Sequence, residues 1–201
     1  EIMPSLVGSE MCIRDSIYSE QNNNIGKNIV DYSANVNPLG LPASVKEAIK
    51  NSIKNCVNYP DPLCRKLIEK LAKYLNIKKE YLFISNGAAD VLFKLALTLK
   101  PGRAVLLAPT FADYEKALRT VDCKFTYYEL QEEKNFIAGY DLLKKINSRV
   151  DLVVICNPNN PTGKLIDEYL LLEVLEKCCR TGTKPVSYTH LRAHETRHDI
   201  V

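Results

Sequence analysis

The sequence predicts an α/β fold built on a mostly parallel, doubly wound sheet, and two observations carry this prediction. Short apolar runs at 104–108 and 152–156 are typical of buried strands, and a third strand is expected at 124–128. Around them, apolar residues recur at helical spacing, as at 88–99 and 167–180. Strands that alternate with helices favour parallel pairing, with helices on both faces of the sheet.

A polar turn from Asn157 to Gly163, NPNNPTG, directly follows the apolar run at 152–156. Open α/β sheets bind ligands outside the carboxyl ends of their strands, so amide side chains at this place are expected to hold a small polar molecule. The alternative is a simple connector, because proline and asparagine are ordinary turn residues.

A second candidate ligand site precedes this turn in the chain. Residues 81–85 are expected to form a strand that passes through an Asn86-Gly87 turn into the helix at 88–99. Small residues leave the first backbone N–H groups of this helix accessible, and the helix dipole favours an anion, so the segment is a candidate phosphate site. The alternative is that Asn-Gly only makes a turn. The absence of GxGxxG and GxxxxGK[ST] argues against a dinucleotide or a nucleoside triphosphate.

An aromatic residue follows the remaining strand end. The run at 104–108 leads into Pro109-Thr110-Phe111-Ala112-Asp113-Tyr114, and a helix is expected near 114–121. Three strand ends therefore carry a phosphate-sized anion site, an aromatic ring and an amide-rich turn. A planar, phosphorylated aromatic cofactor would use all three.

These motifs, in their order and spacing, resemble the fold-type I pyridoxal-phosphate enzymes of the class I/II aminotransferase family. The branch is that of threonine-phosphate decarboxylases and histidinol-phosphate aminotransferases, and the resemblance extends from Ile17 to about Lys184. The segments that carry it are DYSANVNPLG at 31–40, YPDP at 59–62, NGAAD at 86–90, PTFADY at 109–114 and the turn at 157–163. It implies the large domain of that fold, truncated, together with an N-terminal arm.

The resemblance also implies pyridoxal 5'-phosphate as cofactor and a set of residues that would hold it. Gly87, Ala88 and Ala89 would offer the phosphate site, and Phe111 would stack on the pyridine ring. Asn160 would bond the phenolic oxygen of the ring. Asp90, in the first helical turn, has a simpler explanation, because a carboxylate is favourable there without any ligand.

Other implied positions concern a neighbouring subunit and the substrate. In a homodimer, Tyr59 would reach the phosphate of the neighbouring subunit's cofactor. The alternative role for Tyr59 is purely structural, with its ring packed at a turn before a helix. Asn35, Asn37 and Gly40 would line the substrate entrance. Asn35 and Asn37 precede Pro38, so their alternative is turn formation.

The activity implied by the resemblance is the decarboxylation of a phosphorylated amino acid, with histidinol-phosphate aminotransfer as the alternative. This chemistry needs a lysine that forms a Schiff base, an aspartate at the pyridine nitrogen and an arginine for the substrate carboxylate. All three would follow Lys184, so no catalytic residue is assigned within the chain and the fragment is expected to be inactive. A hypothesis of another class is a non-catalytic binding or dimerisation module.

Both ends of the chain differ from its body. Residues 1–16 and 185–201 resemble translated sequencing-library adapter, and we expect them to be non-native. They flank an arm with entry helices at 17–75 and the first half of a cofactor-binding domain at 76–184. The tail contains His194-Glu195-Thr196-Arg197-His198, which fits the zinc motif HExxH. It lies within the adapter-like tail with only three residues after His198, so no metal site is expected.

Composition is less specific. A net charge of +3 is too small to indicate a nucleic-acid partner, and no apolar run is long enough to cross a membrane. The seven cysteines are odd in number and form no CxxC pair, which favours reduced thiols in the cytoplasm.

Overall fold

The computed structural model describes residues 39–189, which form two bodies, 39–86 and 87–189. The body at 39–86 is helical, with α-helices α2 (Ala43–Ser52) and α3 (Arg65–Leu75) and 3-10 helices η2 (Ile53–Asn55) and η3 (Lys79–Tyr81). Asn76 ends α3 in a left-handed conformation, and its N–H donates to the Ala72 carbonyl. Asparagine tolerates that conformation better than most residues.

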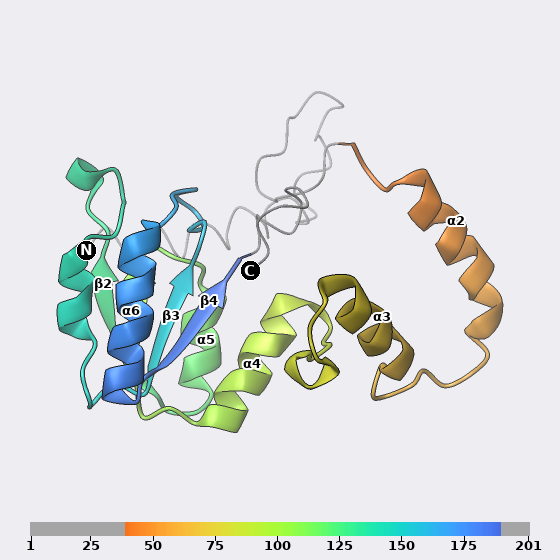
Figure 1. Cartoon of the computed structure of the whole chain (residues 1–201), viewed down its shortest axis with the longest axis horizontal. Helices are drawn as coiled ribbons and strands as arrows, with labels where there is room; N and C mark the ends of the chain where they lie inside the picture. The colour runs from red at the N-terminus through yellow and green to blue at the C-terminus, as the bar shows by residue number, and fades with distance from the viewer. Residues whose placement is uncertain (1–38, 190–201) are drawn as a thin grey trace, which may run out of the picture. The chain divides into compact units, whose positions relative to one another are not determined.

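The body at 87–189 alternates helices and strands, as the sequence predicted (Figure 1). Its strands are β1 (Arg103–Ala108), β2 (Lys124–Glu129), β3 (Leu152–Cys156) and β4 (Lys184–Tyr188). Its α-helices are α4 (Gly87–Leu99), α5 (Asp113–Arg119) and α6 (Glu168–Thr181), and its 3-10 helices are η4 (Glu132–Lys134) and η5 (Tyr140–Lys145). The expected strands at 104–108, 124–128 and 152–156 are confirmed, as are the helices at 88–99 and 167–180 to within a residue or two.

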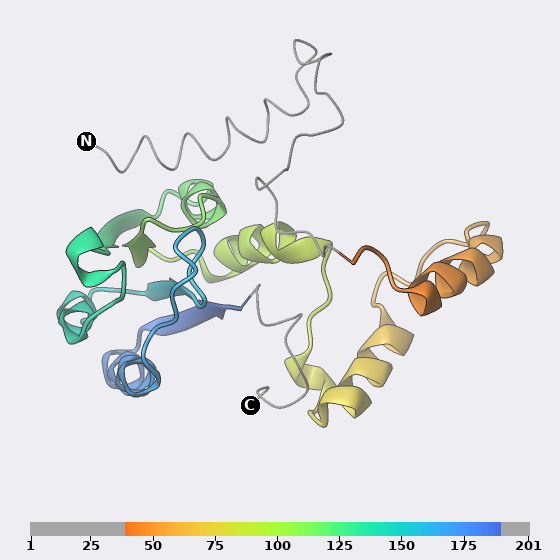
Figure 2. The ribbon, with the colours of Figure 1, turned by 90° about the horizontal axis from the view of Figure 1, so that it is seen from above.

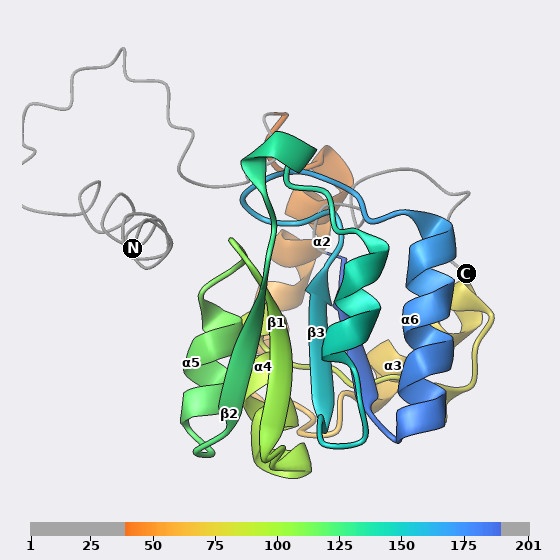
Figure 3. The ribbon, with the colours of Figure 1, turned by 90° about the vertical axis from the view of Figure 1, so that its left-hand side faces the viewer.

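All four strands are parallel and lie in the order β2-β1-β3-β4. The chain goes from β1 outward to β2, then crosses back past β1 to β3 and continues to β4. Helices cover both faces: α4 and α5 lie on one side of the sheet and α6 on the other (Figures 2 and 3). The crossover from β1 to β2, which contains α5, and the crossover from β3 to β4, which contains α6, run in opposite directions across the sheet. Because both crossovers are expected to be right-handed, their helices lie on opposite faces.

Alternation along β1 and β3 divides the core between these two faces. Val105 and Val153 belong to the cluster that also contains Leu170, Val174 and Cys178 of α6. Leu106 and Val154 belong to the other cluster, with residues of α4 and α5. Because both faces of these central strands are covered, the runs are continuously apolar, which is typical of buried parallel strands.

Two boundaries differ from expectation. The predicted strand at 81–85 is wrong: Tyr81 ends η3, and residues 82–85 belong to no strand or helix. The described sheet is formed by β1 to β4, and residues 82–85 take no part in it, because an apolar run joins a sheet only where its backbone pairs with a neighbouring strand.

The second difference lies at the carboxyl end of the described chain. Residues 185–188, which we assigned to the adapter-like tail, form most of β4 and pair with β3. Val186 and Tyr188 alternate toward the face covered by α4 and α5, so this short stretch has the period of a strand. The non-native origin of residues 185–201 stays a prediction, and residues 190–201 lie outside the described range.

Candidate functional site

The strand order creates a topological switch point at the carboxyl ends of β1 and β3. These strands are neighbours, with Ala104, Val105 and Leu106 paired to Leu152, Val153 and Val154. The chain leaves β1 toward α5 on one face and leaves β3 toward α6 on the other. Such a topological switch point is where open α/β sheets bind ligands. The loop after β1 carries Phe111, and the loop after β3 carries the NPNNPTG turn.

A buried amide links these two loops. Asn159 is 3% exposed, and its Nδ2 donates to the Pro109 carbonyl at 2.9 Å and to Thr162 Oγ1 at 3.0 Å. Its Oδ1 accepts a hydrogen bond from Thr110 Oγ1 at 3.0 Å. Thr110, the residue before Phe111, is itself buried. One side chain therefore joins the loop after β1 to the loop after β3.

Further hydrogen bonds hold the turn after β3. Asn157 accepts from the Ile166 N–H at 2.9 Å through Oδ1, and its own N–H donates to the Tyr188 carbonyl at 2.8 Å. Gly163 has a φ of +66°, which glycine adopts without strain, and its N–H donates to the Asn159 carbonyl at 2.6 Å. The expected polar turn at the end of a buried strand is present.

Phe111 and Asn160 lie on the two linked loops and are both half-buried. The Phe111 ring makes an edge contact with Tyr114, with centroids 5.8 Å apart. The Asn160 N–H donates to Cys156 Sγ at 3.4 Å. The structure thus brings the loops of the predicted ring-stacking residue and the predicted ring-bonding residue together at one edge of the sheet.

Two buried residues, Tyr114 and Cys156, contact the residues of these loops: Tyr114 contacts Phe111, and Cys156 contacts Asn160. Tyr114 is 2% exposed, and its hydroxyl has no hydrogen-bond partner in the described part of the chain. Burial raises the pKa of Tyr114 well above its usual range, and the neighbouring Cys156 thiol raises it further. Burial also raises the pKa of Cys156, so this thiol is neutral at ordinary pH. Neither of these two side chains is therefore charged at neutral pH.

The predicted phosphate site lies at the start of α4. Gly87, with a φ of +81°, is exposed, Ala88 is half-buried and Ala89 is exposed. A short turn joins α4 to β1, and Leu92 and Ala96 of α4 belong to the same core cluster as Leu106 of β1. The N–H groups of the first helical turn lack partners within the helix, so this helix start keeps the chemistry expected of an anion site.

Asp90 follows the phosphate site and has a structural role in this arrangement. Its Oδ2 accepts from Lys94 Nζ at 2.7 Å, an i,i+4 pair on the surface of α4. This contact supports the alternative stated for Asp90, in which the carboxylate stabilises the helix without any ligand.

The remaining predicted positions belong to the other body or lie outside the described residues. Tyr59 is fully exposed, and Gly40 has a φ of +69°. Asn35 and Asn37 lie outside the described residues. Tyr59 and Gly40 belong to the body at 39–86, whereas Phe111 belongs to the body at 87–189.

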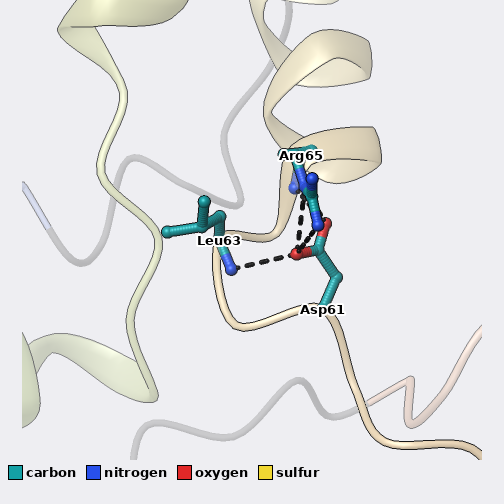
Figure 4. A network of polar contacts seen from close by, with 3 residues as sticks. All are labelled: Asp61, Leu63 and Arg65. Carbon is teal, nitrogen blue, oxygen red and sulfur yellow. Dashed lines mark hydrogen bonds and ion pairs between the residues drawn. The ribbon is translucent and has the colours of Figure 1, made fainter.

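The motif that contains Tyr59 is shaped by its aspartate. Asp61 accepts hydrogen bonds from the N–H groups of Leu63 and Arg65 at 3.1 and 2.9 Å, and its carboxylate also pairs with the Arg65 guanidinium (Figure 4). The bond from the Arg65 side chain is the main reason that the pKa of Asp61 falls to about 2. Asp61 therefore organises the turn before α3, a role that the sequence did not suggest.

Residues 39–189 contain no group of three or more side chains that could hold a metal ion, and the HExxH motif lies outside this range. No helix among the same residues is long and apolar enough to cross a membrane.

The fold and the switch point in its strand order define a class of protein, the α/β proteins whose doubly wound sheets bind ligands at their carboxyl edge. Residues 27–187 match the family described as aminotransferase class I and II, and the chain belongs to this family. The predicted resemblance, the fold-type I class and the cofactor class are therefore confirmed, since this is a family of pyridoxal-phosphate-dependent enzymes.

Several proteins illustrate the similarity. The chain is 33% identical over 150 residues to threonine-phosphate decarboxylase of Salmonella typhimurium, covering 75% of this chain and 41% of the relative. It is 33% identical over 147 residues to histidinol-phosphate aminotransferase of Moorella thermoacetica, covering 72% and 38%. The structure of histidinol-phosphate aminotransferase from Clostridium acetobutylicum matches with a TM-score of 0.70 and 32% identity, over 79% of this chain and 46% of that one. The chain thus spans about two fifths of the curated relatives' length.

The residues of the two linked loops include the kinds of group that suit a pyridoxal ring. Phe111 supplies an aromatic ring and Asn160 an amide, on loops that the buried Asn159 side chain joins, and the start of α4 has the free N–H groups of an anion site. Sequence reasoning missed Asn159 and Thr110, although both lie inside motifs that it had singled out. Asn159 and Asn160 are adjacent and chemically identical, so only the fold shows which amide is buried.

Proposed function

We propose that this chain is part of a pyridoxal-phosphate-dependent enzyme that acts on a phosphorylated amino acid, and that the reaction is decarboxylation of threonine phosphate. The observation that carries the cofactor part is the pair of linked loops that present Phe111 and Asn160 at the switch point. The choice of decarboxylation is supported by the DYSANVNPLG opening at 31–40 and by the similarity to the Salmonella decarboxylase.

Aminotransfer to or from a phosphorylated amino acid of the histidinol-phosphate type is the second candidate. The Moorella aminotransferase relative is as similar in identity as the Salmonella decarboxylase, which gives this alternative its own support. The two reactions share the cofactor and differ in the bond that breaks at the α carbon of the amino acid.

Each predicted cofactor residue has one task in this proposal. Backbone N–H groups of Gly87, Ala88 and Ala89 bind the phosphate at the positive end of α4. The Phe111 ring covers one face of the pyridine ring and excludes water from it. The Asn160 side chain donates to the phenolic oxygen. When bound, pyridoxal phosphate supplies an electron-withdrawing ring that stabilises negative charge at the α carbon.

A second copy of the chain completes the site in this proposal. The fully exposed Tyr59 ring, held at the turn that Asp61 organises, is suited to reach a neighbouring molecule. We expect a homodimer in which Tyr59 of one subunit donates to the phosphate bound by the other. Asn35, Asn37 and Gly40 would then line the entrance for the substrate.

The test is an assay of the complete gene product. The coding sequence is read from source DNA with primers inside the codons for residues 27–187, and the encoded protein is purified with pyridoxal phosphate. Carbon dioxide release from threonine phosphate is measured beside amino transfer from glutamate to imidazole acetol phosphate. Release of carbon dioxide alone supports the proposal, and amino transfer alone supports the second candidate. If the protein catalyses neither reaction, both candidate functions are overturned.

A further inference from the structure

We propose that Asn159 is a positioning residue for the pyridoxal ring, acting through Thr110 and Thr162 to hold Phe111 and Asn160 at a set separation. This inference rests on the proposed function, because it assigns the ring to the switch point, between the two loops. Asn159 contacts neither the ring nor the substrate in this assignment. Its role is to set the distance between two groups that do.

The first argument is connectivity. Two of the three hydrogen bonds of the Asn159 side chain reach the loop after β1, at the Pro109 carbonyl and at Thr110 Oγ1, and the third reaches Thr162 in its own turn. Phe111 directly follows Thr110, and Asn160 directly follows Asn159. The bonds therefore lie one residue away from each group assigned to the ring.

The second argument is burial. Asn159 and Thr110 are 3% and 8% exposed, so water does not replace these bonds when they are lost. An amide at this place satisfies a carbonyl acceptor and a hydroxyl donor at once, which no aliphatic side chain can do. An unsatisfied group here would force the two loops to move relative to each other.

The third argument is the rigidity of the ligand. A pyridine ring is flat and rigid. The group on its face and the group at its edge therefore have to keep their relative positions to within about 0.5 Å. The two loops come from strands that are adjacent in the sheet but separated in the chain by β2. A cross-loop bond is the most direct way to keep such segments in register.

The experiment uses the full 201-residue chain, with pyridoxal 5'-phosphate as the probe and three variants. Thr110→Val removes the hydroxyl that donates to Asn159, and Thr162→Val removes the hydroxyl that accepts from it. Thr183→Val is the matched control, since Thr183 is also buried and donates to the Val150 carbonyl at 2.8 Å, at the opposite end of the sheet. Each variant is measured for cofactor dissociation constant, for the circular dichroism induced in the bound cofactor and for urea stability.

The expected result is a cofactor dissociation constant about fivefold higher in Thr110→Val and in Thr162→Val, the loss that one hydrogen bond of ordinary net strength predicts. The induced circular dichroism falls with it, because the ring is held less firmly. Thr183→Val loses similar stability but keeps the wild-type dissociation constant and dichroism. Inorganic phosphate, which probes only the start of α4, has the same dissociation constant in all four proteins.

Other outcomes overturn the inference in distinguishable ways. Wild-type dissociation constants and dichroism in both Thr110→Val and Thr162→Val overturn the positioning role and leave the proposed function intact. Equal weakening in all three variants, in proportion to lost stability, shows a purely structural role and also overturns it. Failure of the unaltered chain to bind pyridoxal phosphate overturns cofactor binding by this chain, and the inference with it. If one valine variant does not fold, the other decides the result.

Discussion

The Tyr114 hydroxyl provides a prediction with an unusual sign, because its removal should stabilise the protein. The hydroxyl is buried and has no hydrogen-bond partner among residues 39–189. Its polar neighbour is the Cys156 thiol, a weak hydrogen-bonding group that already contacts the Pro158 carbonyl at 3.2 Å. Tyr114→Phe removes the hydroxyl and keeps the ring, with its edge contacts to Phe111 and to Tyr188.

The magnitude follows from the cost of burying an unsatisfied hydroxyl. Mutational data place that cost at about 1–3 kcal/mol, and part of it is offset by the weak contact with the thiol, so we expect a gain of about 1 kcal/mol. For a body of this size, that gain corresponds to a rise of about 4 °C in the midpoint of thermal unfolding. Urea and thermal unfolding followed by far-ultraviolet circular dichroism measure both quantities.

Tyr128→Phe is the matched control, since it makes the same chemical change at a hydroxyl that is bonded. Tyr128 donates to Asp141 Oδ1 at 2.6 Å and accepts from the Gly139 N–H at 3.0 Å. Its loss should cost about 2 kcal/mol. If Tyr114→Phe were destabilised as well, the hydroxyl would have a partner and the reasoning from an unsatisfied buried group would be refuted.

Two further predictions concern carboxylates at helix starts. Since the pKa of Asp61 is lowered from 3.8 to about 2 in the folded state, chiefly by its bond with Arg65, its contribution to stability is present above pH 3.8 and is lost as the pH falls toward 2. Asp61→Asn should remove this pH dependence and speed hydrogen exchange at the Arg65 amide; a carboxyl that titrates near 3.8 by NMR would contradict the assignment. Asp167 Oδ1 accepts from the Leu170 N–H at 3.0 Å at the start of α6, so Asp167→Ala should lower the free energy of unfolding by about 1 kcal/mol, whereas Asp167→Asn should cost less than half of that. Equal losses in these two variants, measured by urea unfolding, would show that the cap bond is not the cause.

Much of the site could be predicted because its parts are local. Apolar periodicity identified the strand at 152–156, and the residues that follow it had to form a polar turn. Identification of Phe111 and Asn160 came from motifs that resemble a known family, and the structure places their loops side by side. Their roles toward the cofactor, like that of Tyr59, stay predictions.

Other parts could not be predicted from local pattern. The run at 81–85 has the composition of a strand, yet a strand also needs a partner, and composition does not show one. Asp61 illustrates the same difficulty on a smaller scale. Its carboxylate pairs with Arg65 because the turn brings the two side chains together. The order of residues in YPDP does not predict that turn, so it does not predict the pair.

The sequence by itself determined where the helices α4, α5 and α6 lie, which central strands are buried on both faces, and where the polar and aromatic residues follow them. These properties depend on hydrophobic period and turn chemistry, which act over a few residues. Only the tertiary structure decided that β3 lies beside β1 although β2 intervenes in the chain, and that Asn159 rather than Asn160 joins the two loops. Strand order is set by long-range burial of both sheet faces, so the neighbours across the switch point become known only when the whole sheet is assembled.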